Sequence, residues 1–175
     1  MKMIPVRVHR LLALVLIAVT ASTLLNAAPA GAAIAYFQLA AFNGMIGGVD
    51  KCASVGGASL ANGAPLVSWS CVGGAHQTWR WTGNDEIINS NSGKCLAIGS
   101  ASKDAGARAI QWTCNGGREQ KWVKTSAGAG EGWILRNLNS GYVLSVSGDS
   151  DANGTWIVQW GYSGSDGQKW EERHI

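Results

Sequence analysis

This chain of 175 residues has four cysteines, whose spacing indicates whether they form disulfides or bind a metal. Cys52 and Cys71 are separated by 19 residues, and so are Cys95 and Cys114. A zinc site would need close pairs such as Cys-x-x-Cys, which the sequence lacks. Four cysteines allow three disulfide connectivities, but the repeated separation favours one bridge per interval. We therefore expect two disulfides, each worth about 3 kcal/mol in the chain-entropy model, and no metal site.

Residues for acid–base or nucleophilic catalysis are few. His76 has no evident nucleophile and orienting acid to complete a catalytic triad. Asp149 and Asp151 are neighbours in one loop, whereas glycoside hydrolysis needs two carboxylates facing each other across a cleft. No phosphate-binding loop or dinucleotide fingerprint occurs, because the glycines follow a different pattern. The sequence therefore predicts a protein without catalytic activity and without a cofactor.

Tryptophans and glutamines follow a spacing that recurs three times. In each copy a Trp is followed ten residues later by the Trp of a Gln-x-Trp motif. The copies align without a gap over residues 52–79, 95–122 and 143–170. Six positions are identical in all three: Ser59/Ser102/Ser150, Gly63/Gly106/Gly154, Trp69/Trp112/Trp160, Gly73/Gly116/Gly164, Gln77/Gln120/Gln168 and Trp79/Trp122/Trp170. Such self-similarity is typical of a fold built from repeats.

The sequence around the repeated Trp and Gln residues is typical of short strands joined by tight turns. LVSW, AIQW and WIVQW are β-prone runs, and the dipeptides Asn62-Gly63 and Asn153-Gly154 are hairpin signals. No run has the length or 3.6-residue period of a helix. A β-propeller needs at least four blades, so three copies favour a closed threefold barrel of hairpins. We predict an all-β fold, a β-trefoil with three pseudo-symmetric repeats at about 36–81, 82–128 and 129–175.

The first residues have the pattern of a secretory signal peptide. Lys2, Arg7 and Arg10 precede an almost wholly apolar run at 11–25, and small residues follow it. This run is shorter than the roughly 20 residues that span a bilayer. A retained signal anchor is the alternative, but basic residues do not follow the run. We predict a cleaved signal peptide at 1–33, a secreted, extracellular protein, and no membrane span after cleavage.

The charge of the chain excludes one class of partner. Lys and Arg number 14 and Asp and Glu 11, a formal net charge of +3. The three basic residues of the leader account for this whole excess, so the mature chain is neutral. Proteins that bind nucleic acid normally carry a basic excess that neutralises phosphates. We therefore predict no nucleic-acid partner.

Three Gln-x-Trp motifs, each ten residues behind an aromatic residue, together with cysteine pairs that frame the hairpins, resemble the ricin B-chain-type lectins. They are similar as well to the family-13 carbohydrate-binding modules of secreted bacterial enzymes. The resemblance covers the mature chain, residues 36–175. It implies a lectin-like β-trefoil with up to three shallow sugar sites and glycan partners, such as galactoside- or xylan-like polymers.

The resemblance also assigns roles to the two Trp of each copy. The Trp of each Gln-x-Trp motif becomes a core residue, with its Gln fixing local hydrogen bonds. The earlier Trp becomes a platform on which the C–H face of a pyranose packs, although all six Trp could instead be structural. The candidate carbohydrate-binding residues are Ser54, Trp69 and His76 in the first copy, Trp112 and Asn115 in the second, and Ser145, Trp160 and Asp166 in the third.

The sequence departs from the family pattern at the floor of each site. Sugar-binding members commonly have an Asp there, whereas this chain has Ser54, Ala97 and Ser145. Since Ala97 cannot hydrogen-bond a hydroxyl, the second copy is predicted to complete the barrel only. Asp149 and Asp151 could supply the missing acid in the third copy.

A second function stays open from the sequence. The protein could be an interaction protein without sugar binding, such as a protease inhibitor or the partner subunit of a toxin or hydrolase. The contact would then be made by loops, with an apolar edge around Leu60, Pro65 and Trp156.

Overall fold

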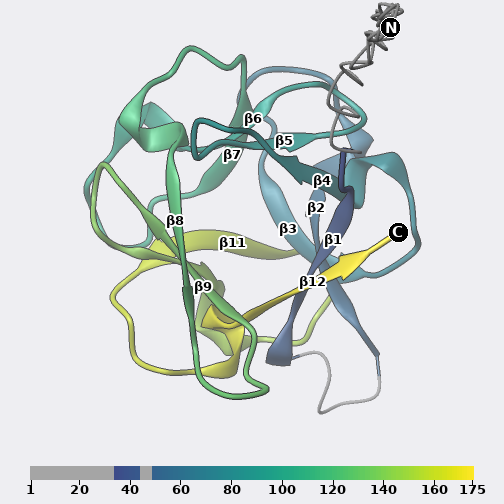
Figure 1. The fold of residues 1–175 in the computed structure, drawn as a ribbon, viewed down its shortest axis with the longest axis vertical. Coiled ribbons are helices and arrows are strands. Elements are labelled where there is room, and N and C mark those ends of the chain that lie inside the picture. The colour runs from purple at the N-terminus through teal and green to yellow at the C-terminus, as the bar shows by residue number, and fades with distance from the viewer. Residues whose placement is uncertain (1–33, 44–48) are drawn as a thin grey trace, which may run out of the picture. The chain divides into compact units, whose positions relative to one another are not determined.

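The computed structural model describes residues 34–43 and 49–175 (Figure 1). The predicted signal peptide, residues 1–33, lies outside these described residues. The strands are β1 (Phe37–Ala41), β2 (Lys51–Val55), β3 (Leu66–Ser70), β4 (Thr78–Trp81), β5 (Ile87–Asn89), β6 (Cys95–Ile98), β7 (Ala109–Trp112), β8 (Trp122–Ser126), β9 (Trp133–Asn137), β10 (Val143–Val146), β11 (Thr155–Trp160) and β12 (Trp170–His174). One-turn 3-10 helices are η1 (Gly56–Ala58), η2 (Ala75–Gln77), η3 (Gly99–Ala101), η4 (Arg118–Gln120), η5 (Ser147–Asp149) and η6 (Asp166–Gln168). In the described part of the chain, no helix has the length and apolar character needed to cross a membrane.

Six strands form a closed barrel. Antiparallel pairs join β1 to β4, β4 to β5, β8 to β9, β9 to β12 and β12 to β1. The remaining junction, between the β5 and β8 segments, is a bridge between Glu86 and Lys121. Closure leaves no exposed sheet edge on the barrel, which removes a common route to aggregation.

The first and last strands of the described chain pair with each other and so close the barrel. β1 and β12 pair over five residues, from Phe37 opposite His174 to Ala41 opposite Trp170, and they cross in front of the barrel in Figure 1. The Arg173 guanidinium on β12 hydrogen-bonds Asp50, which precedes β2, and this hydrogen bond holds the pKa of the Asp50 carboxyl below its ordinary value.

Three hairpins extend from the barrel and touch one another. They are β2–β3, β6–β7 and β10–β11. β3 pairs with β11, Pro65 bridges to Ile110, and Arg108 bridges to Val158, so each hairpin contacts the other two. We call β1–β4 lobe 1, β5–β8 lobe 2 and β9–β12 lobe 3. The predicted all-β fold of three pseudo-symmetric hairpin lobes is confirmed.

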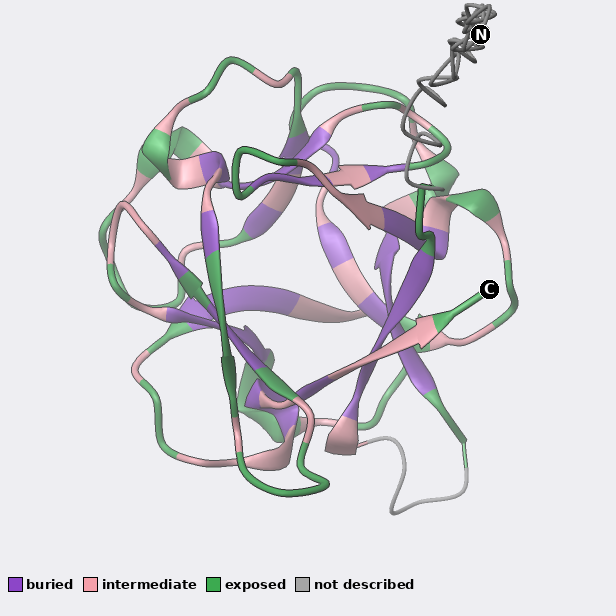
Figure 2. Ribbon diagram, viewed as in Figure 1, coloured by how far each residue is buried: buried purple, intermediate pink, exposed green. Residues whose placement is uncertain are grey.

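The Trp residues of the Gln-x-Trp motifs fill the core. Trp79, Trp122 and Trp170 are at most 1% exposed and belong to one buried hydrophobic cluster. Figure 2 shows that buried residues are concentrated on the strands, whereas most exposed residues lie in the loops. Each indole N–H donates a hydrogen bond to a backbone carbonyl on the first hairpin strand of its own lobe, which is β2, β6 or β10. The distances are 3.0, 3.0 and 3.1 Å. These hydrogen bonds matter because a buried N–H without an acceptor is costly.

The Gln of each motif fastens the loop that precedes it. The buried Gln77 side chain accepts a hydrogen bond from the Val72 backbone N–H at 2.8 Å and donates to the Ser70 carbonyl at 2.9 Å. Gln120 and Gln168 make the corresponding pairs of bonds at 2.8 to 3.0 Å. The side-chain amide of each Gln therefore pairs with one backbone N–H and one backbone carbonyl of the loop, two groups that would otherwise lack a partner from a neighbouring strand.

Both predicted disulfides are confirmed. Cys52 is joined to Cys71 and Cys95 to Cys114, each with a Cα–Cα distance of 5.1 Å. Each bridge ties the first strand of a hairpin to the residues that follow its second strand. In lobe 3 the matching positions are Val143, which is buried, and Tyr162, which is exposed.

Candidate functional site

A cleft lies beside the hairpin of each lobe, in the same relative place. The volumes are about 440 Å³ in lobe 1, 710 Å³ in lobe 2 and 500 Å³ in lobe 3. In every cleft one wall is the Trp that lies near the end of the second hairpin strand. Trp69, Trp112 and Trp160 are 44%, 42% and 50% exposed, so a large part of each indole faces solvent. The ten-residue spacing therefore separates a Trp in a cleft from a Trp in the core.

The opposite wall is a 3-10 turn that follows the first hairpin strand. The middle residues of η1, η3 and η5 line the clefts, and all three have left-handed backbones: Gly57 (φ 60), Ser100 (φ 54) and Gly148 (φ 63). The left-handed residue changes the direction of the chain, so the strand ends there and the chain continues along the rim of the cleft.

The floor of each cleft is small and carries no acid. Ser54, Ala97 and Ser145 line the floors and are 2% to 6% exposed. Ser145 donates to the neighbouring Val146 carbonyl at 3.3 Å. The floor can therefore offer a hydroxyl in lobes 1 and 3 and only a methyl group in lobe 2.

The polar groups at the rim differ from lobe to lobe. His76 of η2 lines the lobe 1 cleft and Glu119 of η4 lines the lobe 2 cleft. Gly167 takes the matching position in lobe 3, where Asp149 from the opposite wall accepts a hydrogen bond from the Gly167 N–H. A β-carbon at Gly167 would lie 2.5 Å from that Asp149 oxygen, so the glycine makes room for the acid.

A glycine from the preceding lobe stands behind each cleft Trp. A β-carbon added to Gly63, Gly106 or Gly154 would lie 3.7, 3.2 or 3.7 Å from the ring of the Trp in the next lobe. All three have left-handed φ angles of 82° to 85°, which favour glycine. The sequence indicated these glycines as repeated residues of hairpin turns. Their second contact could not be read from it, because the Trp belongs to a different lobe.

Gly106→Ala tests this backing contact. The left-handed backbone should cost about 1–2 kcal/mol, and the close approach to Trp160 should add to it. Gly116→Ala is the matched control, because Gly116 has φ 77 and open space where a β-carbon would go. We expect a larger loss of unfolding free energy for Gly106→Ala in urea titrations, together with a shifted Trp160 indole N–H signal in NMR spectra. Equal losses and an unmoved indole signal would contradict the contact.

Six of the eight residues predicted from the sequence line the clefts. Ser54, Trp69 and His76 line the first, Trp112 the second, and Ser145 and Trp160 the third. Asn115 instead accepts a hydrogen bond from the Gly117 N–H at 2.8 Å, and Asp166 binds the Lys169 ammonium at 3.2 Å. Neither of these two side chains is among the cleft residues, and neither is Asp151.

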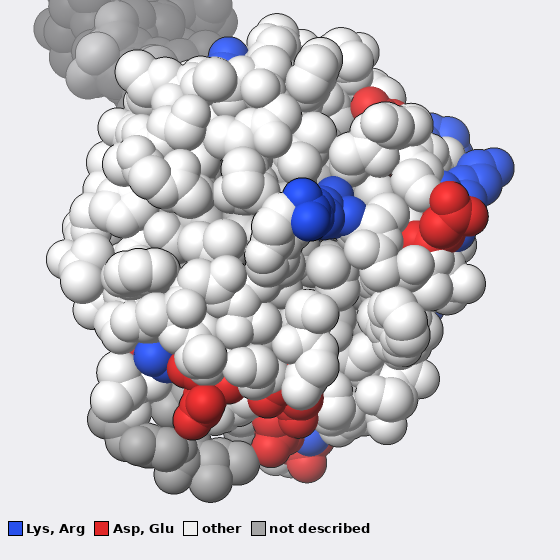
Figure 3. Space-filling view, turned by 180° about the vertical axis from the view of Figure 1, so that it is seen from behind, with Lys and Arg blue, Asp and Glu red and all other residues white. Residues whose placement is uncertain are grey.

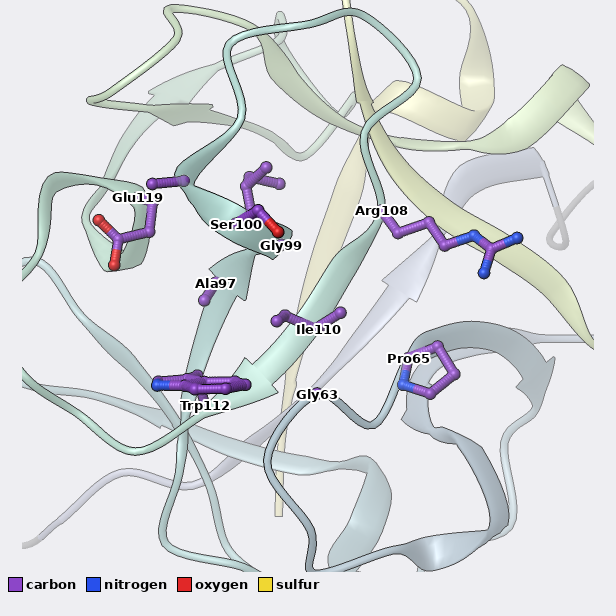
Figure 4. Close-up of a pocket in the computed structure, with 11 residues that line it drawn as sticks. Gly63, Pro65, Ala97, Gly99, Ser100, Arg108, Ile110, Trp112 and Glu119 are labelled. Atoms are coloured by element: carbon purple, nitrogen blue, oxygen red, sulfur yellow. The ribbon is translucent and has the colours of Figure 1, made fainter.

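The lobe 2 cleft contains Arg108, a residue that sequence reasoning missed, beside Glu119, which the sequence had placed at the rim. Although the sequence favoured a purely structural second lobe, its cleft is the largest of the three. Figure 4 shows Trp112 near Ala97, with Glu119 and Arg108 on opposite sides of Ile110. Arg108 gave no signal in the repeat, because the matching residues are Pro65 and Trp156.

The arrangement suits recognition of a ligand that has one apolar face and several polar groups. Shallow clefts with an aromatic wall and a few placed polar groups bind and orient such molecules. No group of three or more His, Cys, Asp or Glu side chains that could hold a metal ion occurs within residues 34–43 and 49–175.

Comparison with known proteins connects this geometry to a family. Residues 42–170 match the family described as "Ricin-type beta-trefoil lectin domain". Among curated proteins, no match to the chain was found. Many solved structures resemble it.

Three of these structures are informative. A designed threefold-symmetric protein, ThreeFoil, is 31% identical with a TM-score of 0.74, and the match covers 80% of this chain and 99% of that one. An exo-beta-1,3-galactanase from Clostridium thermocellum is 28% identical with a TM-score of 0.73, over 81% of this chain and 30% of the enzyme. The C-terminal half of an earthworm R-type lectin, in complex with GalNAc, is 16% identical with a TM-score of 0.62, over 81% and 99% of the two chains, and shows the same fold.

Proposed function

We propose, because this chain belongs to the ricin-type beta-trefoil lectin domain family, that it binds glycans through the clefts of its three lobes. The observation that carries the proposal is the repeated position of Trp69, Trp112 and Trp160. Each presents a half-exposed indole as the wall of a cleft. The aliphatic face of a pyranose packs on such a ring, while its hydroxyls bond to polar groups at the rim.

The polar groups of each cleft supply different partners for sugar hydroxyls. Lobe 1 offers Ser54 and His76, lobe 2 offers Glu119, and lobe 3 offers Ser145 and Asp149. A carboxylate forms hydrogen bonds roughly twice as strong as those of a neutral acceptor. We therefore assign the stronger sites to lobes 2 and 3, where Glu119 and Asp149 take the place of the acid missing from the floor.

The proposal includes export and the absence of catalysis. Residues 1–33 act as a cleaved signal peptide, and residues 36–175 form the mature, secreted domain. The two disulfides support this, because such bonds persist mainly in oxidising compartments. Glu119 and Asp149 belong to clefts of different lobes, so neither cleft pairs them as glycoside hydrolysis requires.

Binding to immobilised polysaccharides tests the proposal. Each site should be weak, and polymers should bind more tightly than free monosaccharides because several lobes act together. We expect the mature protein to be retained by galactoside- or xylan-type polymers and released by their oligosaccharides. The same protein should give signals on a glycan array. Silence on the array and on all polymers, with a folded protein, would refute glycan binding.

A further inference from the structure

Arg108 is an exposed cation that lines the lobe 2 cleft. None of the ion pairs of the described residues involves it, and its guanidinium makes none of their hydrogen bonds. Charged side chains are also sparse on the face of the molecule turned away from the viewer of Figure 1, where much of the surface is white (Figure 3). An anion that enters the cleft therefore meets a guanidinium that is not paired with any carboxylate of the described residues.

The Arg108 side chain is held in place by its neighbours. Its guanidinium lies over the ring of Trp156, on the adjacent β11 strand. A guanidinium stacked in this way uses its flat face and keeps its N–H groups at the edge, where they can form two parallel bonds to a planar anion. Trp156, which the sequence placed on an exposed apolar edge with Leu60 and Pro65, is instead partly covered by this cation.

The two charges of the cleft lie at opposite ends. Figure 4 shows Glu119 on the side of Trp112 and Ala97, and Arg108 beyond Ile110 on the other side. Glu119 would repel an anion at the Trp112 end, where a neutral sugar can stack and donate hydroxyls to the carboxylate. The arrangement therefore sets the direction in which a charged oligosaccharide would bind.

We propose that the lobe 2 cleft binds anionic oligosaccharides, with a neutral sugar on Trp112 and a carboxylate or sulfate group on Arg108. This inference rests on the proposed glycan binding and assigns a ligand class to one of its sites. Pro65 and Trp156 replace the cation in lobes 1 and 3, so we expect those lobes to prefer neutral sugars. Carboxylate and sulfate share the recognition chemistry, since both accept two parallel N–H bonds from arginine.

Calorimetric titration of the mature protein with three oligosaccharides tests this assignment. The ligands are a neutral xylo-oligosaccharide, the same oligosaccharide bearing a glucuronic acid, and a sulfated galactoside. We expect Arg108→Gln to weaken binding of at least one acidic ligand by about tenfold or more, as loss of a charge-assisted pair predicts. Binding of the neutral ligand should stay unchanged. Whichever acidic ligand loses affinity identifies carboxylate or sulfate as the natural group.

Lys103→Gln is the matched control, because it removes one exposed cation from the same hairpin without lining a cleft. It should leave all three affinities unchanged. A neutral ligand that binds as before to Arg108→Gln shows that the cleft is intact. If neutral ligands bind and Arg108→Gln changes no affinity for acidic ones, the anionic assignment fails alone. If no ligand of any kind binds to the folded protein, the proposed glycan binding fails with it.

Discussion

Replacing Trp122 by alanine should lower the free energy of unfolding by about 4 kcal/mol, a typical cost for a large aromatic in a core. The ring is 1% exposed and lies in the common core of the three lobes. Its indole N–H donates to the Leu96 carbonyl at 3.0 Å, so the substitution also leaves that buried oxygen without its partner. Since the total free energy of unfolding of such a domain is about 5–15 kcal/mol, the variant should be close to unfolding at 25 °C. Urea titration followed by circular dichroism measures the loss.

Trp112→Ala provides the comparison within the same lobe. Trp112 is ten residues earlier and 42% exposed, and its ring forms a cleft wall and not part of the core. Surface substitutions of this kind usually change stability by less than about 1 kcal/mol. Similar losses for the two variants would contradict the division between a core Trp and a cleft Trp in each lobe.

The sequence was sufficient to predict the fold because the information is local and repeated three times. Each copy contains the same hairpin signals, the same pair of Trp and the same Gln, and a single closed arrangement of three such units buries one Trp from each. The disulfides followed from an equal separation of Cys52 from Cys71 and of Cys95 from Cys114.

The clefts were only partly predictable, because each is assembled from two lobes. Gly106 belongs to the turn of lobe 2, but a β-carbon added there would lie 3.2 Å from the ring of Trp160 in lobe 3. Alignment of the copies does not reveal that two lobes approach each other in this way. The family resemblance suggested Asn115 and Asp166 as sugar-binding residues of the second and third copies. In the structure Asn115 caps its own loop and Asp166 pairs with Lys169.

The distribution of acids shows the same difficulty. Lobe 2 places its carboxylate on η4, as Glu119, whereas lobe 3 places it on η5, as Asp149, opposite a glycine. Position-by-position comparison of the copies treats these residues as unrelated. The structure shows that the clefts of lobes 2 and 3 each have one acidic side chain, contributed by different walls, whereas the lobe 1 cleft has none.

Removing all three cleft Trp should abolish retention on polysaccharide. By analogy with aromatic pairs, stacking of a sugar on an indole should contribute about 0.5–1.5 kcal/mol beyond the area it buries. Each single Trp→Ala substitution should therefore weaken its own site by up to about tenfold. The combined variant Trp69→Ala, Trp112→Ala, Trp160→Ala should lose more than about 100-fold in apparent affinity for a polymer, because avidity needs more than one active lobe. Retention on an immobilised polymer and titration with oligosaccharide measure these losses.

Trp133→Ala is the matched control for this series. Trp133 is 36% exposed, close to the exposure of Trp112, but it lies on β9 away from the clefts, with the Lys124 ammonium 4.6 Å from its ring centre. It should bind polysaccharide as the unchanged protein does. Single substitutions also rank the lobes: if lobes 2 and 3 are the stronger sites, Trp112→Ala and Trp160→Ala should cost more than Trp69→Ala. Retention of the folded triple variant at the level of the unchanged protein would place sugar binding outside the clefts, because a pyranose cannot stack on a wall that has been removed.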